Sequence, residues 1–162
     1  EGGVYKGFLY VGLMIKNNEP FLIEFNVRMG DPECQTILPT LTSDLLDILI
    51  ACCDKTLDQI KINFSCSKSV CVVLCSKGYP EKFDTKVEIK DLEQIKLLKN
   101  QNIFHAGTLN TKSGIVSNGG RVLNFVSISD DFLKCRNEVI NLIQKLNWKN
   151  GYFRRDIGHK VI

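Results

Sequence analysis

The sequence contains few of the residues that build metal centres or disulfide frameworks. It has two histidines, and its seven cysteines are an odd number with no pair at CxxC spacing. This spacing disfavours a structural zinc site and a secreted disulfide scaffold. The apolar neighbours of Cys52, Cys53, Cys71 and Cys75 instead predict small core residues in a reducing compartment. We therefore expect a cytoplasmic protein.

Long apolar runs and strong charge are also missing. No run approaches the roughly 18 apolar residues that a membrane helix needs. The net charge is +3, from 21 basic and 18 acidic residues that are scattered along the chain. These features predict neither a membrane nor a nucleic-acid partner. The sequence begins without Met and without a signal peptide, so we expect a piece of a longer chain.

The hydrophobic patterns predict an α+β fold with a boundary near residues 58–68. Before the boundary, apolar runs at 7–15 and 20–25 flank Asn17-Asn18 and predict a hairpin. A helix is expected over 43–57, with Ser43 as its N-cap. After the boundary, strands are expected at 69–76, 103–110, 114–118 and 121–128. Helices are expected at 91–100 and at 129–146, the latter capped by Ser129.

The stretch "IEFNVRMGDPE" at 23–33 is the most informative part of the sequence. Alternate residues of a strand share a face, so Glu24, Asn26 and Arg28 are expected to point one way and the apolar residues between them into a core. A carboxylate and an amide oxygen about 6–7 Å apart suit Mg²⁺, which takes few protein ligands and keeps phosphates and water. Arg28 suits an anionic oxygen, and together the three side chains suit phosphoryl transfer.

The "GDPE" turn that follows predicts a helix start. Gly30 permits a positive φ, Asp31 can act as N-cap, Pro32 fits the first helical position and Glu33 suits the first turn. The alternative for the whole stretch is a solvated sheet face that carries an Arg–Glu surface pair. Residue types alone leave both interpretations open.

The order of several short motifs resembles a known family. The strings "YKGFLYVGLMI", "FLIEFNVRMGDPECQ", "VVLCSKGYP", "FHAGT", "GGRVL" and "YFRRDIG" span nearly the whole chain. They are similar to the C-terminal part of glycinamide ribonucleotide synthetase (phosphoribosylamine–glycine ligase), an ATP-grasp family of purine synthesis. The resemblance implies the C-terminal part of an ATP-grasp domain at 1–60, with antiparallel strands plus a helix, and a small α+β C-terminal domain at 61–162.

The resemblance also implies a reaction and roles for the 23–33 stretch. ATP phosphorylates glycine, and the amine of 5-phosphoribosylamine attacks the acyl phosphate. Glu24 and Asn26 would hold Mg²⁺ (or Mn²⁺) on the ATP phosphates. Arg28 would act in catalysis, and Arg28, Gly30 and Asp31 would bind substrate. Many ATP-grasp enzymes carry another metal-binding acid on the preceding strand, but "FLYVGLMI" has none.

In the second half, the "NGGRVL" and "SKGYP" motifs offer weaker candidates. Arg121 and Lys77 are candidates for binding the phosphate of the substrate, and Gly119 and Gly120 would allow close backbone approach. The alternatives are a tight turn with a solvated arginine and an ordinary surface lysine. His105 between Phe and Ala is expected to be a hydrogen-bonded structural residue, and we assign it no catalysis.

The chain contains no glycine-rich phosphate loop, so upstream domains of the same chain are expected to grip the nucleotide. The isolated chain is then expected to be inactive, and fusion to other purine-pathway enzymes beyond Ile162 is open. Two alternatives remain at this point. One is another ATP-grasp carboxylate–amine ligase, since Glu-x-Asn-x-Arg is shared widely in that superfamily. The other is a noncatalytic assembly module.

Overall fold

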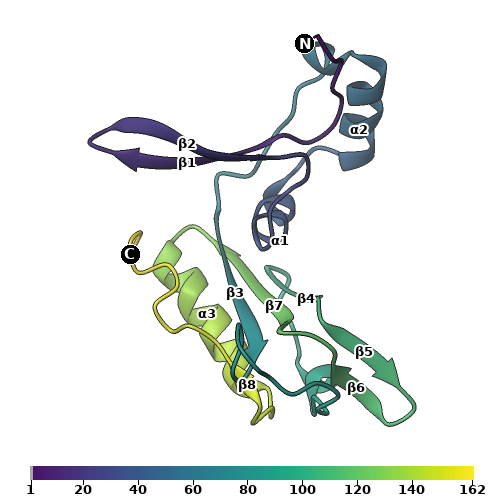
Figure 1. Ribbon diagram of the computed structural model, residues 1–162, viewed down its shortest axis with the longest axis vertical. Coiled ribbons are helices and arrows are strands. Elements are labelled where there is room, and N and C mark those ends of the chain that lie inside the picture. The colour runs from purple at the N-terminus through teal and green to yellow at the C-terminus, as the bar shows by residue number, and fades with distance from the viewer. Residues whose placement is uncertain (1) are drawn as a thin grey trace. The chain divides into compact units, whose positions relative to one another are not determined.

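The computed structural model describes residues 2–162, which divide into two compact units, 2–65 and 66–162. The first unit contains a hairpin of β1 (Tyr10–Lys16) and β2 (Glu19–Asn26), then α1 (Glu33–Ile37) and α2 (Leu45–Asp54) (Figure 1). Short 3₁₀ turns follow each helix, at Leu38–Thr40 and Leu57–Gln59. No helix of the described chain is long and apolar enough to cross a membrane.

The predicted hairpin is confirmed together with its turn. Asn17 and Asn18 have φ of 53° and 64°, and the two-residue turn that joins twisted strands tightly needs positive φ at both positions. The strands pair antiparallel, with a register shift between Gly12 and Leu13. Asparagine tolerates this left-handed conformation better than most residues, so the turn follows from local sequence.

The expected core behind β2 is not found. Ile23, Phe25 and Val27 are 61%, 59% and 72% exposed, so the prediction that they point into a core is wrong for this unit. The apolar side chains of α2 are exposed in the same way: Ala51 is the only buried residue of this helix, and Leu46 is 64% exposed. No described element of the first unit covers these apolar side chains.

The capping predictions shift by one or two residues. The N-cap of α2 is Asp44, whose carboxylate accepts from the backbone N–H groups of Leu46 and Asp47, and Ser43 instead accepts from the backbone N–H of Asn63. The N-cap of α3 (Phe132–Lys145) is Asp131 rather than Ser129. Both helices begin later than expected, and in each case an aspartate is the side chain that reaches the free N–H groups.

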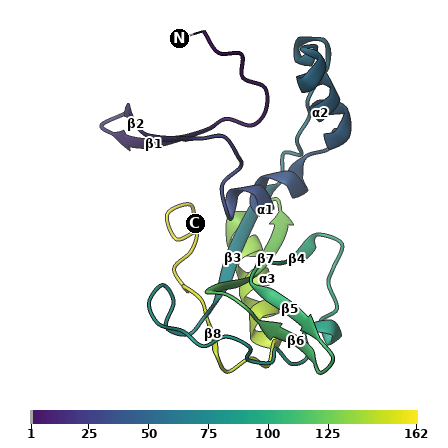
Figure 2. The same cartoon turned by 45° about the vertical axis from the view of Figure 1, so that its right-hand side comes forward.

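The second unit is built on a four-stranded antiparallel sheet of order β4-β7-β3-β8. Its strands are β3 (Lys68–Ser76), β4 (Gln101–His105), β7 (Arg121–Ser129) and β8 (Gly151–Tyr152). The helix α3 lies along this sheet in both views (Figures 1 and 2). Val139, Leu142 and Ile143 of α3 pack with Val72 and Phe125 of the sheet in one core. The α+β fold is confirmed.

Two predictions for this unit are wrong in part. The expected helix at 91–100 is only a 3₁₀ turn, Leu92–Gln94, because Asp91 adopts a left-handed φ of 62° and Ile95 is extended. The expected strand at 103–110 is divided into β4 and β5 (Thr108–Thr111). The chain bends between them, so that β4 pairs with β7 while β5 pairs with β6 (Gly114–Ser117).

No cysteine in residues 2–162 forms a disulfide. Cys71 is buried and Cys52 and Cys75 are partly buried, as expected, but Cys53 is exposed, so the prediction of a core position is wrong for Cys53.

A segment near the end of the chain is held by Arg136, whose guanidinium donates to the carbonyls of Arg155 and Ile157.

Candidate functional site

Two of the sequence-predicted site residues meet on β2. The Asn26 Nδ2 donates to the Glu24 Oε1 at 2.9 Å, so the two side chains share one face of the strand. Gly12 pairs with Glu24 across the hairpin, and a Cβ at Gly12 would lie 3.1 Å from the Glu24 Cγ. The missing side chain on β1 therefore leaves room for the Glu24 carboxylate.

This pair fits a hard divalent cation. Glu24 is exposed and Asn26 is half-buried, and they offer one carboxylate and one amide oxygen. Within residues 2–162, no group of three or more His, Cys, Asp or Glu side chains is placed to hold a metal ion. A cation here would therefore take only two ligands from this part of the chain. That suits Mg²⁺, which usually completes its octahedron with phosphates and water.

Arg28 lies beyond the end of β2 and lines a small cavity. The cavity has a volume of about 150 Å³, and Arg28, Gly30 and Glu33 contribute to its wall. The other lining residues are mainly apolar: Phe8, Leu9, Tyr10, Met29 and Ile37. The Arg28 Nη1 donates to the Met29 carbonyl at 3.2 Å. One cationic and one anionic side chain thus border a space otherwise walled largely by apolar groups.

The roles expected within "GDPE" change. Gly30 does not adopt a positive φ; the Glu33 carboxylate lies where a Cβ at Gly30 would be, so a side chain at this position would displace that flexible carboxylate. Asp31 is not the N-cap, since α1 begins at Glu33 after Pro32, and the Asp31 carboxylate accepts from the Gln35 Nε2 at 3.0 Å. From the sequence we expected Glu33 only as an acid in the first turn of the helix, and its place in the cavity wall was not predicted. Its position two residues after an expected substrate-binding residue was the available signal.

In the second unit, three of the motifs come together through the backbone. The Gly107 N–H of "HAGT" donates to the Arg121 carbonyl at 2.9 Å, and the Asn118 N–H donates to the Gly107 carbonyl at 2.7 Å. The Ser76 N–H, just before Lys77, donates to the Gly120 carbonyl at 2.8 Å. Close packing at Gly119 and Gly120 is thus used by the chain itself, with Gly107 against Gly119 and the Tyr79 ring against Gly120.

Lys77 and Arg121 lie in different surroundings. Arg121 is exposed at the start of β7 and pairs with Cys75 across the sheet. Burial raises the pKa of the Cys75 thiol, and the positive charge of Arg121 opposes this rise. Lys77 follows β3, and its backbone N–H donates to the Asn150 carbonyl at 2.8 Å. Lys77 borders a cavity of about 640 Å³ in this unit.

His105 is hydrogen-bonded as expected. Its Nδ1 lies 2.9 Å from the Thr108 Oγ1, across the bend between β4 and β5. This contact connects two strands that belong to different sheets. It supports a structural role for His105.

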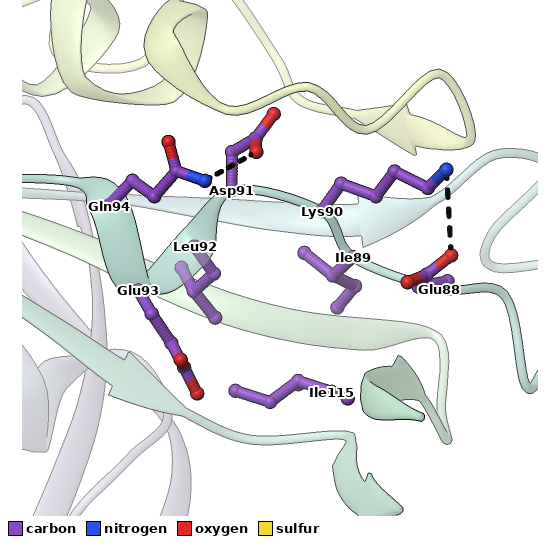
Figure 3. A pocket seen from close by; sticks show the side chains of 9 residues that line it. Glu88, Ile89, Lys90, Asp91, Leu92, Glu93, Gln94 and Ile115 are labelled. Atoms are coloured by element: carbon purple, nitrogen blue, oxygen red, sulfur yellow. Dashed lines mark hydrogen bonds and ion pairs between the residues drawn. The ribbon is translucent and has the colours of Figure 1, made fainter. Parts of the chain in front are cut away.

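A second cavity of the unit is shown in Figure 3 and contains none of the predicted site residues. Its volume is about 410 Å³, and Asp91, Glu93 and Glu88 are among its lining residues. The Gln94 Nε2 donates to the Asp91 carboxylate at 3.0 Å, and Lys90 lies 3.7 Å from Glu88. Two of its acids thus already have partners within the wall.

Two family models match the chain in order. The phosphoribosylglycinamide synthetase ATP-grasp (A) domain matches residues 1–34, and the phosphoribosylglycinamide synthetase C domain matches residues 69–160. The Glu24–Asn26 pair and Arg28 fall within the first match, and Lys77, His105 and Arg121 fall within the second.

Curated relatives named phosphoribosylamine–glycine ligase align with almost the whole chain. The relative from Caldanaerobacter subterraneus is 41% identical over 98% of this chain and 37% of its own length. The chloroplastic relative from Arabidopsis thaliana is 39% identical over all of this chain and 31% of its own length. This chain thus spans between about a third and two fifths of the relatives' length.

A solved structure agrees with these sequence matches. The crystal structure of phosphoribosylamine–glycine ligase from Thermotoga maritima superposes with a TM-score of 0.74 and 29% identity, covering 93% of this chain and 36% of that one. The order of the two family-model matches and the shared fold indicate the same family. The chain belongs to the phosphoribosylglycinamide synthetase family, of which it matches the C domain and, over residues 1–34, the ATP-grasp (A) domain.

Proposed function

We propose that this chain forms the metal-binding wall and the C-terminal domain of a phosphoribosylamine–glycine ligase. In this reaction a glycine carboxylate oxygen attacks the γ-phosphorus of ATP, and ADP leaves. The amine of 5-phosphoribosylamine then attacks the carbonyl carbon of glycyl phosphate, a C–N bond forms, and phosphate leaves. The products are glycinamide ribonucleotide, ADP and phosphate. The observation that carries the proposal is the Glu24–Asn26 pair, followed at once by the cavity between Arg28 and Glu33.

Glu24 and Asn26 are proposed to bind Mg²⁺, with Mn²⁺ as the alternative ion. The carboxylate supplies charge and the amide supplies a second oxygen once the amide turns toward the ion. The bound ion would neutralise charge on the ATP phosphates. The protein's own contribution is to hold both side chains on one strand face, where the Asn26 Nδ2 donates to the Glu24 Oε1.

Arg28 is proposed as the catalytic residue of this chain. Its guanidinium can stabilise charge on the transferred phosphoryl group or on the glycine carboxylate. Gly30 and Asp31 are proposed to lie beside the same substrate. A zwitterionic amino acid carries one charge of each sign, and the cavity presents Arg28 and Glu33 to match them. This match favours glycine over a simple carboxylic acid as substrate.

Lys77 and Arg121 are proposed to contribute to binding of phosphoribosylamine, whose phosphate needs cationic partners. We further propose that residues 1–60 belong to the ATP-grasp domain and 61–162 to the C-terminal domain. The division of the chain after residue 65 supports this boundary. We propose that the upstream domains of the relatives' longer chain contact the exposed apolar faces of β2 and α2. We also propose that the protein is cytoplasmic.

The test is ADP formation by a longer chain that carries the upstream segment found in the relatives. We expect ADP only when glycine and phosphoribosylamine are both present, and no ADP from the 162-residue chain alone. Glu24→Gln should lower the rate about 100-fold or more, because it removes a charged metal ligand. Glu19→Gln on the same strand is the matched control and should leave the rate unchanged.

The outcomes separate the proposal from its alternatives. ADP that depends on another carboxylic acid would assign a different ATP-grasp ligase. A folded longer chain that forms no ADP would favour a noncatalytic module. Glycine-dependent ADP from the isolated chain would contradict the need for upstream domains.

A further inference from the structure

The two glycines just before Arg121, here called the glycine segment (Gly119 and Gly120), are both held by one serine. Ser76 is 0% exposed. Its backbone N–H donates to the Gly120 carbonyl at 2.8 Å, and its hydroxyl donates to the Gly119 carbonyl at 2.9 Å. A planar peptide group turns as a unit, so holding two successive carbonyls fixes the two peptide groups that lead into Arg121.

The ring of Tyr79 packs directly on Gly120. A Cβ at Gly120 would lie 2.1 Å from the Tyr79 Cδ2, 2.6 Å from its Cε2 and 3.1 Å from its Cγ, so the ring occupies the place that a side chain would take. These atoms belong to one rigid ring, which can make room only by swinging out as a whole. A side chain at position 120 and the ring at position 79 therefore exclude each other.

The turn that carries Tyr79 limits the movement of its ring. The Tyr79 N–H donates to the Ser76 carbonyl at 3.1 Å, and the Glu81 N–H donates to the Gly78 carbonyl at 2.9 Å. The Tyr79 ring also lies beside the Phe83 ring, with the two centroids 6.0 Å apart. The same turn thus supplies the serine that binds the glycine segment and the ring that packs on it.

We propose that Ser76 and Tyr79 are positioning residues, which hold the glycine segment so that the Arg121 guanidinium is directed at the second substrate. Neither of them is expected to touch the substrate itself. The inference rests on the proposed function, because that function gives Arg121 its ligand. It goes further by assigning a role to two residues that lie far from Arg121 in sequence, since the Ser76 hydroxyl bond alone spans 43 residues.

Substrate kinetics of the longer, ADP-forming chain test this role. Tyr79→Ala should raise the KM for phosphoribosylamine about tenfold, the effect of losing one charge-assisted hydrogen bond. It should leave kcat and the KM values for ATP and glycine within about twofold, because a group that binds substrate and transition state equally affects KM alone. Ser76→Ala should act in the same direction but less, since its backbone hydrogen bond remains. Tyr79→Phe keeps the ring and is the matched control, with unchanged kinetics.

Gly120→Ala adds a test by compensation. Alone, its methyl group would meet the Tyr79 ring and should raise the KM for phosphoribosylamine. In combination with Tyr79→Ala the ring is gone, so the methyl group should cause little further change. The KM of the double variant should therefore lie well below the value expected if the two single effects multiplied.

The Cys75 thiol gives a readout that needs no ligase activity. Cys75 pairs with Arg121 across the sheet, and burial raises the pKa of this thiol while the positive charge of Arg121 opposes the rise. Displacement of Arg121 should move the pH profile of Cys75 alkylation to higher pH, whereas mere loosening of the turn would expose the thiol and move the profile to lower pH. The profile is measured on the 162-residue chain by peptide mass spectrometry, and Arg121→Gln sets the shift expected when the charge is lost.

The results separate positioning from simple packing. A selective rise in the KM for phosphoribosylamine, with an alkaline shift of the Cys75 profile in Tyr79→Ala but not in Tyr79→Phe, supports the proposal. An equal rise in all three KM values, or a shift to lower pH, would overturn it. So would a profile that moves in Arg121→Gln but not in Tyr79→Ala. A longer chain that forms no ADP would refute the proposed function, and the Cys75 profile would still decide whether the turn positions Arg121.

Discussion

Gly107→Ala should destabilise the second unit far more than Gly119→Ala, although the two glycines pack against each other. A Cβ on Gly107 would lie 2.7 Å from the Arg121 carbonyl oxygen, 2.9 Å from the Gly119 Cα and 3.1 Å from the Gly119 nitrogen. All three are backbone atoms and cannot move away as a side chain does. A Cβ on Gly119 would lie 3.3 Å from the Gly107 Cα and 3.8 Å from the Arg121 carbonyl oxygen, which a small shift relieves.

The magnitude follows from the contacts that the new methyl group disturbs. Overpacking costs about 1–3 kcal/mol. Two backbone hydrogen bonds of Gly107, to Arg121 and from Asn118, are strained as well, at about 1 kcal/mol each. The reduced freedom of the unfolded chain returns about 0.4–1 kcal/mol. The net loss for Gly107→Ala is about 2–4 kcal/mol, or roughly 10–25 °C in Tm for a unit of this size, whereas Gly119→Ala should stay within about 1 kcal/mol.

Thermal unfolding, followed by circular dichroism, measures the stability of both variants, and urea unfolding is the check. The near-ultraviolet signal of Trp148 reports on the second unit specifically, since the first unit has no tryptophan. Equal losses for the two variants, or a larger loss for Gly119→Ala, would refute the argument that the backbone contact at Gly107 decides the packing of this bend.

Three other variants or probes test separate features. Asp44→Ala should lower the stability of α2 by about 0.5–2 kcal/mol and reduce its helical signal, because it removes the cap, whereas Ser43→Ala should leave the α2 cap intact. Alkylation should modify the exposed Cys53 and Cys66 first and Cys135 last, and raising the pH should speed the reaction at Cys135 only in the more alkaline range, because burial raises the pKa of that thiol and keeps it protonated; early modification of Cys135 would contradict its placement. Leu142→Ala should cost about 2–5 kcal/mol in urea unfolding, since Leu142 is 1% exposed in the core between α3 and the sheet, and a cost below about 1 kcal/mol would contradict that packing.

The local features of the chain could be predicted where neighbouring residues decide the conformation. The hairpin turn at Asn17 and Asn18 follows from side chains that tolerate positive φ. The alternation of Glu24 and Asn26 on one strand face follows from strand geometry. The long helix α3 was predictable because its apolar spacing extends over several turns, which is the most reliable signal in a sequence.

Where contacts between distant residues decide, sequence patterns were insufficient. The expected helix at 91–100 does not form because Leu92 and Ile95 pack against the core, and this packing outweighs the weak helix propensity of the segment. The strand at 103–110 was divided because the bend at Gly107 brings its backbone against Gly119, a contact that no local pattern encodes. Arg28 lies past the end of β2, so strand alternation alone did not place it in the cavity with Glu33.

By itself, the sequence determined the family, the α+β class and the pairing of Glu24 with Asn26, because these depend on residue order and on short-range geometry. Only the tertiary structure decided what surrounds those residues. It placed Glu33 and Arg28 in the wall of one cavity, it used Gly119 and Gly120 for internal packing, and it brought Lys77, Trp148 and Asn150 to the wall of another cavity. The physical reason is that charge and hydrogen bonding at a site act through space, between side chains whose separation along the chain carries no information about their distance.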